Sequence, residues 1–226
     1  MRLSSLKFDT DGVEIRRGIL AREDIEAVKA EISLGCEKLR QHGIRNLEKR
    51  FSCIAHLAAS PHILAIANDL LRSPPRLVRA LFFDKTADMN WFVSWHQDKT
   101  VTLNKKCEMA GWRAWSLKDN VCHVQPPSAV LDEMITFRMH VDDADEDNGC
   151  LKVIPGSHRF GILKQDEIIR LTSGSTPIAC VVAAGDAVIM RPHVMHSSSK
   201  SLRQAHRRVV HLEYSSHSLP TGIDWA

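Results

Sequence analysis

The pattern of the chain changes at Ser73-Pro74-Pro75, and this change constrains the fold more than any other feature of the sequence. Before the two prolines, apolar residues recur at helical spacing over about 22–40, which predicts one helix. A second helix is expected over 61–71, because Ser60 is a plausible N-cap, Pro61 suits the first turn and the two prolines end it. A short entry strand is expected within residues 7–20, because Asp-Gly and Gly signals bound an alternating run there. The N-terminal third is therefore predicted to be mostly helical.

After the prolines the chain consists of short segments that are rich in apolar and β-branched residues and bounded by turn formers, which predicts strands. These segments are residues 77–83, 129–141, 150–154, 178–183, 187–190 and 209–214, with one helix expected near 165–171. Helices followed by many short strands predict a mainly β fold with flanking helices, a sandwich or barrel, and argue against a parallel βαβ fold. The long insertion at 102–128 carries two tryptophans and is more typical of a lid or binding loop than of a passive connector.

Length and composition indicate one globular domain over residues 1–226, with buttressing elements in 1–75 and the β core in 76–214. The net charge of +3 and the absence of a basic block argue against nucleic acid as a partner. No apolar run approaches the roughly 20 residues that cross a bilayer, and the N-terminus lacks a secretory pattern. Six scattered cysteines without a C-x-x-C pair fit reduced thiols, so we expect a cytoplasmic protein, either monomer or homodimer.

The segment Trp95-His96-Gln97-Asp98 carries the strongest chemical signal in the sequence. In a strand, residues i and i+2 point to the same face, so the imidazole and the carboxylate could converge on one ion. Two histidines and one carboxylate on one face of an octahedron leave three positions open for a chelating co-substrate and oxygen, as in non-haem Fe(II) enzymes. A third ligand must come from elsewhere, and His193 and His196 are the candidates.

The His-x-Asp spacing is weak evidence alone, because a chain with 12 histidines matches it by chance about once. Indeed His140-Val141-Asp142 is a second match, which we discount because it runs into an acidic turn that is expected to be solvated. From spacing alone, a metal site at 96 and 98 and a structural His–Asp hydrogen bond explain the pair equally well.

Five stretches, taken together and in order, resemble the phytanoyl-CoA dioxygenase family of Fe(II)/2-oxoglutarate oxygenases over nearly the whole chain. They are LFFDKT at 81–86, WHQDKT at 95–100, DNGCLKVIPGSH at 147–158, GDAVIM at 185–190 and the segment 196–214. The resemblance implies a double-stranded β-helix, the jelly roll shared with cupins. It also implies Fe(II), 2-oxoglutarate and O2 as cofactors, with iron held at the barrel mouth by His96, Asp98 and a distal histidine.

The resemblance favours His196 over His193 as the distal ligand, because Ser198 and Arg207 follow it at the family's spacing of two and eleven residues. A guanidinium suits the far carboxylate of 2-oxoglutarate, since it can bind a carboxylate with two hydrogen bonds. Arg208 is the alternative, and strand parity allows only one of the two arginines to face the interior. His193 is expected to line the site or to pack structurally.

Further candidates lie on one predicted strand face and among the tryptophans. Thr136 aligns with the position from which family members offer a side chain to the co-substrate, and Arg138 and His140 share its face. Because a buried arginine needs a partner, Arg138 is a candidate for a substrate carboxylate or phosphate, with a structural ion pair as the equal alternative. Trp95 and Trp112 could shape the substrate pocket, although core packing is the commoner role for a tryptophan.

The implied activity is that of a 2-oxoglutarate-dependent dioxygenase, a hydroxylase of an unactivated C–H bond that releases succinate and CO2. Because Asp98 supplies the carboxylate ligand, no position is vacated for halide, and halogenation is disfavoured. The substrate is expected to be a small molecule, anionic if Arg138 faces the pocket. Two alternatives stay open: a cupin-like metal enzyme that does not use 2-oxoglutarate, and a catalytically silent binding or regulatory barrel.

Overall fold

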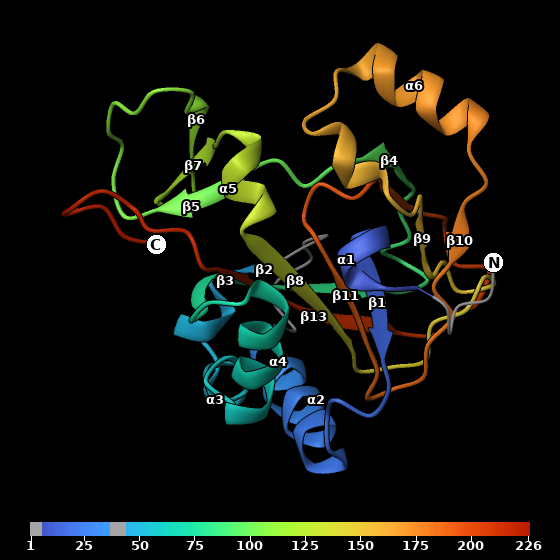
Figure 1. Ribbon diagram of the computed structural model, residues 1–226. Helices are drawn as coiled ribbons and strands as arrows, with labels where there is room; N and C mark the ends of the chain where they lie inside the picture. The colour runs from blue at the N-terminus through green and yellow to red at the C-terminus, as the bar shows by residue number, and fades with distance from the viewer. Residues whose placement is uncertain (1–5, 37–43) are drawn as a thin grey trace.

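The computed structural model describes residues 6–36 and 44–226, and its framework is a pair of antiparallel sheets (Figure 1). The six-stranded sheet has the order β1 (Val13–Arg16), β11 (Ala187–Met190), β8 (Met134–His140), β13 (Arg207–Ser215), β3 (Arg76–Lys85) and β2 (Ile44–Arg45). The four-stranded sheet has the order β10 (Ile178–Ala179), β9 (Leu151–Val153), β12 (His196–Ser198) and β4 (Val93–His96). Strands that are neighbours in a sheet are far apart in the sequence, as in a jelly roll, and the mainly β fold class is confirmed.

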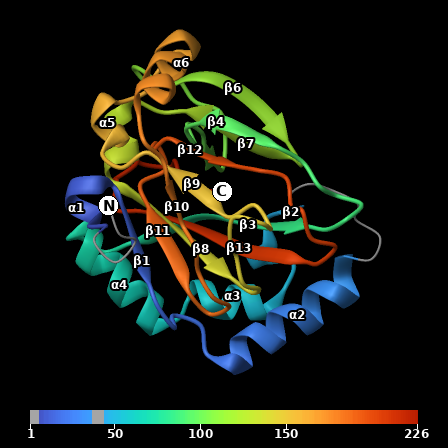
Figure 2. The same cartoon turned by 90° about the vertical axis from the view of Figure 1, so that its right-hand side faces the viewer.

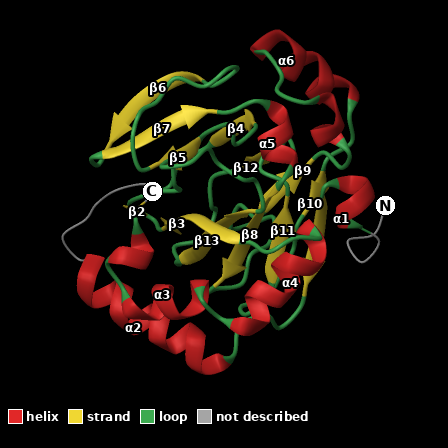
Figure 3. Cartoon of the chain, turned by 60° about the vertical axis from the view of Figure 1, so that its left-hand side comes forward, coloured by secondary structure: helices red, strands yellow, loops and turns green. Residues whose placement is uncertain are grey.

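Helices cover the outer face of the six-stranded sheet (Figures 2 and 3). The helical segments are α1 (Phe8–Asp11), α2 (Arg22–Cys36), η2 (Leu47–Lys49), α3 (Ser52–Ala58), α4 (Pro61–Leu71), α5 (Ser128–Asp132), η3 (Ser157–Phe160) and α6 (Gln165–Gly174). The main hydrophobic core lies between this sheet and α2, α3 and α4, and includes Phe82, Phe137 and Tyr214. The phenol of Tyr214 donates to the carbonyl of Ala58 at 2.8 Å, which ties β13 to α3.

Alternation along the strands divides the sheet into an apolar face and a polar interior. In β13, Val210 and Leu212 join the helix-side core, whereas His211 faces the cavity between the two sheets. Both faces are buried, so almost every residue of β8 and β13 is inaccessible to solvent. A polar residue at an alternate position of such a strand therefore lies inside the protein, where it needs a partner or a ligand.

The insertion at 102–128 forms most of a separate three-stranded sheet, with the order β5 (Val101–Leu103), β7 (Val121–Gln125) and β6 (Arg113–Lys118). In Figure 1 this sheet projects from one side of the molecule. Val101, Leu103 and Val124 bury it against α5 and the C-terminal segment. None of its residues lines the cavity described below.

Four predicted elements differ from the observed ones, and one of them is the strand expected at 178–183, which is observed only over Ile178–Ala179. The expected entry strand at 7–20 begins as α1, which ends at Gly12 with a left-handed φ of 71°, and only β1 is extended. The predicted strand at 129–141 is split, because its first residues form α5 and β8 starts at Met134. The helix expected at 22–40 is observed to Cys36, and residues 37–40 lie outside the described residues.

Within the described ranges, no single helix is long and apolar enough to span a membrane. The pair α3 and α4 passes that test only jointly, and a 42° bend separates the two helices.

Candidate metal centre

The end of β4 places His96 and Asp98 on one side of the chain and Gln97 on the other. The Gln97 amide donates to the carbonyls of Gly161 (2.7 Å) and His193 (2.8 Å), so it fastens the strand end to two neighbouring loops. The backbone N–H of Asp98 donates to the carbonyl of Pro192 at 2.9 Å. These bonds hold the His-x-Asp backbone in place without using either of its two donor side chains.

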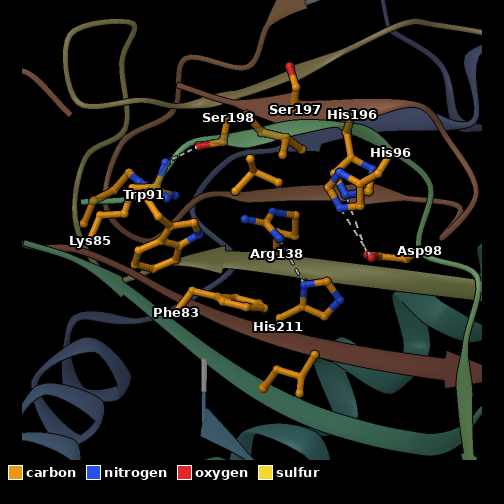
Figure 4. Close-up of a pocket in the computed structure, with 14 residues that line it drawn as sticks. Phe83, Lys85, Trp91, His96, Asp98, Arg138, His196, Ser197, Ser198 and His211 are labelled. Atoms are coloured by element: carbon orange, nitrogen blue, oxygen red, sulfur yellow. Dashed lines mark hydrogen bonds and ion pairs between the residues drawn. The ribbon is translucent and has the colours of Figure 1, made fainter. Parts of the chain in front are cut away.

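His196 faces His96 directly, because β12 and β4 are antiparallel neighbours with these two residues in register. Their ring centroids are 4.2 Å apart. Each Nδ1 lies 2.8 Å from the carbonyl of the residue two positions earlier in the chain, that of Ser94 for His96 and that of Val194 for His196. Each Nε2 lies 3.7 Å from an oxygen of Asp98. Dashed lines mark both contacts in Figure 4.

This geometry fits a bound metal ion better than a structural hydrogen bond. A separation of 3.7 Å is too long for a hydrogen bond, so the three donors converge without bonding to one another. The Nδ1 contacts assign the ring proton to Nδ1 and leave a lone pair on each Nε2, as is usual for histidine ligands. Two nitrogens and one carboxylate form the set that binds Fe(II) with open positions.

Electrostatics favours the protonation states that metal binding needs. Burial and the neighbouring His96 lower the pKa of His196 to about 3, so its ring is neutral at physiological pH. Burial opposes ionisation of Asp98, but His196 and His96 outweigh it and hold the pKa of this carboxyl below its usual range. A neutral imidazole and an ionised carboxylate are the forms that act as ligands.

A cavity of about 100 Å³ opens beside the triad, enough for a compact ligand and far more than a single water needs. It is lined from the six-stranded sheet by Leu81, Phe83, Lys85, Arg138, Arg207 and His211, and from the four-stranded sheet and its connections by Trp91, Val93, His96, Asp98, Leu151, His196, Ser197 and Ser198. The cavity is therefore the interior of the barrel, and Figure 4 shows the triad at one end of it and Lys85 at the other.

Strand parity separates the two candidate arginines of β13. Arg207 lines the cavity and is 3% exposed, and its Nε has no hydrogen-bond partner among the described residues. Arg208 points to the opposite face, where its Nε and Nη2 donate to the two oxygens of Asp142 at 2.8 and 2.7 Å. Of these two arginines, Arg207 is therefore the one available to an anion inside the barrel.

Behind the triad, a chain of buried hydrogen bonds positions Arg138. The Arg138 guanidinium lies 3.1 Å from Nδ1 of His211, so it donates there and leaves the His211 proton on Nε2. That nitrogen lies 3.1 Å from Oε1 of Glu213, which also accepts from Arg79 at 2.8 Å. Asp98, His211 and Glu213 could geometrically hold a second ion, but the donors of His211 and Glu213 are already engaged and Arg79 adds a positive charge.

We expect Glu213→Ala to destabilise the protein by about 3–5 kcal/mol, because it leaves the charge of Arg79 buried and unpaired. The matched control is Glu133→Ala, which breaks a half-exposed contact with His217 and should cost no more than about 1 kcal/mol. Urea unfolding of both variants measures the two changes. Equal losses of unfolding free energy in the two variants would show that the buried Arg79–Glu213 pair stabilises the protein no more than the half-exposed contact does.

Five other predicted site residues lie away from the cavity lining. Thr136 and His140 are fully buried, and their polar side-chain atoms have no hydrogen-bond partner in the described part of the chain. His193 is also fully buried, with Nε2 3.1 Å from an oxygen of an α5 aspartate. Trp95 packs against α6, and Trp112 belongs to the core of the projecting sheet. The roles that the sequence suggests for these five residues remain predictions.

Three residues of the site have no predicted role. Lys85 lies within the stretch 81–86 that resembles the family. It alternates in β3 with Leu81 and Phe83, so strand parity would have placed its side chain inside the barrel. His211 and Glu213 share the parity of Arg207 in β13, so the same argument would have placed them on the inner face. Their mutual contacts, however, depend on strand register, which the sequence does not display.

Comparison with known families matches residues 8–209 to phytanoyl-CoA dioxygenase (PhyH). Phytanoyl-CoA dioxygenase domain-containing protein 1 of Danio rerio is 23% identical over 202 residues, 81% of this chain and 60% of that protein. The Bos taurus protein of the same name is 24% identical, and the match covers 53% of its length. L-proline trans-4-hydroxylase of Streptomyces griseoviridis is 25% identical over 88% of this chain and 74% of that protein. The chain thus spans little more than half the length of the first two relatives.

Solved structures share the fold. SnoK, a non-heme alpha ketoglutarate dependent carbocyclase from nogalamycin biosynthesis, superposes with a TM-score of 0.72 at 15% identity, covering 95% of this chain and 86% of SnoK. HygX of Streptomyces hygroscopicus, with nickel and 2-oxoglutarate bound, gives 0.65 at 18% identity, covering 95% and 84%. At these identities the likeness establishes the double-stranded β-helix architecture.

Proposed function

Because the chain belongs to the phytanoyl-CoA dioxygenase (PhyH) family of Fe(II)/2-oxoglutarate-dependent oxygenases, we propose that it oxidises an unactivated C–H bond of a small molecule, with release of succinate and CO2. The observation that carries this proposal is the convergence of two unbonded Nε2 atoms and one carboxylate beside a buried basic cavity. Hydroxylation is the simplest outcome of such a reaction.

In this proposal His96, Asp98 and His196 hold Fe(II) and Arg207 binds the distal carboxylate of 2-oxoglutarate, while Ser198, whose hydroxyl donates to the carbonyl of Gly149, lines the cavity beside that carboxylate. The bound metal supplies oxygen-dependent decarboxylation of 2-oxoglutarate coupled to oxidation of the substrate. The protein fixes the two imidazoles through their Nδ1 hydrogen bonds. The His96 side chain is 37% exposed, whereas that of His196 is 4% exposed, so the substrate approaches from the His96 side.

We further propose that the substrate carries a carboxylate or phosphate that pairs with Arg138. This guanidinium lines the cavity and is 8% exposed, and its side-chain hydrogen-bond partner among the described residues is the ring of His211. Its Nε has no hydrogen-bond partner among the described residues. A buried guanidinium without a carboxylate partner is costly, and an anionic group of the substrate would supply that partner.

The test is succinate release by the iron-loaded protein with a panel of small carboxylic and phosphorylated metabolites, each paired with its neutral amide or ester. We expect acids to stimulate succinate formation and their neutral analogues to do so far less, since a hydrogen bond to a charged group contributes about 1.5–3 kcal/mol. Failure of iron and 2-oxoglutarate to yield succinate under any condition would refute the proposed activity. Equal turnover of acids and neutral analogues would refute only the anionic substrate.

The mass of the product then decides the reaction type. Hydroxylation adds one oxygen atom, ring closure or desaturation removes two hydrogens, and epimerisation leaves the mass unchanged. We expect the addition of one oxygen. Retention of Asp98 as a ligand also predicts that chloride or bromide has no effect on the product.

A further inference from the structure

Two like charges stand opposite one another inside the barrel. Lys85 at the end of β3 and Arg207 at the start of β13 are paired in register, so their side chains point to the same face. Both line the cavity, with exposures of 0% and 3%. Like charges directly opposite in a sheet are destabilising, and burial raises that cost because water cannot screen them.

No carboxylate forms an ion pair with either cation in the described residues. Two nearby acids are engaged elsewhere: Asp84 of β3 with His206 at 2.7 Å, and Asp142, just after β8, with Arg208 at 2.7 Å. The Lys85 ammonium instead contacts neutral groups: it donates to Oγ of Ser198 and lies over the ring of Trp91. The protein thus concentrates positive charge at this end of the cavity and leaves it without an internal counter-ion.

The position of the Lys85 ammonium is fixed by the backbone around it. Its Nζ lies 2.7 Å from Oγ of Ser198 and 2.5 Å from the carbonyl of Ser199, and the Ser198 hydroxyl donates onward to the carbonyl of Gly149 at 2.8 Å. Gly149 has a φ of 74°, and a Cβ there would collide with the carbonyl oxygen of Ser199. The close approach of these two segments therefore requires glycine and holds the ammonium toward the cavity.

We propose that Lys85 and Arg207 jointly bind one carboxylate, the distal carboxylate of 2-oxoglutarate or succinate, and that they do so even when no metal is bound. A carboxylate bound by the guanidinium through both oxygens and by the ammonium on the other side would accept from the donors of Arg207 and offset the repulsion between the two cations. This inference rests on the proposed function only for the identity of the ligand. That a carboxylate binds here is inferred from the two cations and their positions on this face of the cavity.

The alternative is that Lys85 only clamps β12 to β3 through its contacts with the two serines. The two roles predict opposite results in metal-free protein. A clamp affects stability and leaves the affinity for anions unchanged. A carboxylate-binding residue controls affinity, and its removal relieves repulsion in the ligand-free protein.

The experiment is calorimetric titration of the full chain, stripped of metal with EDTA, with succinate as the probe and succinamide as its uncharged control. We expect succinate and not succinamide to bind. Lys85→Met should weaken succinate binding by about 10- to 100-fold, the range expected for a lost hydrogen bond to a charged group. Lys85→Arg should retain most of the affinity. The matched control Lys152→Met removes a half-buried lysine of β9 that faces Glu146 and should change nothing.

The pH dependence of succinate affinity is a second measurement. It should be unaffected by Lys85 if this residue only connects β12 to β3. Burial and the nearby charges of Arg207 and Arg138 lower the pKa of Lys85 to about 7. As the pH rises through that value, ligand-free Lys85 loses its proton, so succinate affinity should fall. Burial keeps the Cys150 thiol protonated, with a pKa of about 11, and His140 neutral, so neither explains a change near pH 7. In Lys85→Met this fall should be absent.

The outcomes separate this inference from the proposed function. Wild-type affinity in Lys85→Met, together with a lower melting temperature, would establish the clamp and overturn the proposal. A pH-independent affinity in the wild type, or no succinate binding without metal, would overturn it as well, even if the iron-loaded protein consumes 2-oxoglutarate. Binding that depends on Lys85 would support it, even if no substrate supports turnover.

Discussion

Replacement of His196 by alanine is expected to abolish Fe(II) binding and succinate formation, whereas replacement of His193 should preserve both. His196 provides one of three convergent donors, and its Nε2 faces Asp98 across a 3.7 Å gap. Loss of even a hydrogen-bond partner of a metal ligand costs about 10- to 100-fold in affinity, so loss of the ligand itself should cost more. Metal content after dialysis and calorimetric titration with Fe(II) under anaerobic conditions measure the effect.

His193 is a demanding control because it lies in the same segment and is also fully buried. Its ring contacts an α5 aspartate and lies 6.0 Å from the ring of His158, away from the cavity. His193→Ala should therefore lower the melting temperature through the lost packing while iron binding remains. The reverse pattern, with iron retained in His196→Ala and lost in His193→Ala, would show that the distal ligand is misassigned.

The elements that the sequence predicts well are those whose signals are local. The observed α4 has the predicted bounds of 61–71, because a proline in its first turn and two prolines after its end define both limits. The strand β11 is likewise found at 187–190. Here a short apolar run is bounded by Gly185-Asp186, and every residue in it is buried.

The elements that the sequence misses are short apolar segments whose secondary structure depends on tertiary contacts. Residues 128–132 form α5 although Val130 and Leu131 would suit a strand equally well. The same ambiguity hides α3, a seven-residue helix whose apolar residues pack on the sheet. The insertion at 102–128 has too few periodic residues to reveal the hairpin of β6 and β7, whose register is irregular.

The candidate site is predictable to the extent that it depends on strand parity. The alternation of His96 and Asp98 brings their side chains to one side, but selection of His196 relied on resemblance, since two histidines lie close together in the same segment. The juxtaposition of Lys85 with Arg207, and that of His211 with Arg138, joins strands that are distant in sequence. Such contacts follow from sheet topology, which no local pattern encodes.

Arg207→Met is expected to reduce 2-oxoglutarate affinity by at least about 30-fold while Fe(II) affinity changes little. Loss of one partner from a buried, hydrogen-bonded charge pair costs about 2–5 kcal/mol, because the remaining charge is left unpaired. Arg207 is buried and is paired in register with Lys85, which Figure 4 shows at the opposite end of the cavity from the triad, so the triad side chains do not depend on it. The measurement is anaerobic titration of the iron-loaded protein with 2-oxoglutarate, followed by the visible absorption of the chelate.

The neighbouring residue gives the matched control, since Arg208→Met removes the same charge from the same strand. Its guanidinium is held by Asp142 on the other face, so this variant should lose some stability and keep its affinity for 2-oxoglutarate. The two variants thus differ only in the side of β13 from which a cation is removed. If Arg208→Met weakens co-substrate binding more than Arg207→Met does, the parity of β13 is wrong, and with it the inward direction of His211 and Glu213. Because the cavity residues of β3 and β8 are in register with β13, such a result would also displace Lys85 and Arg138 from the barrel interior.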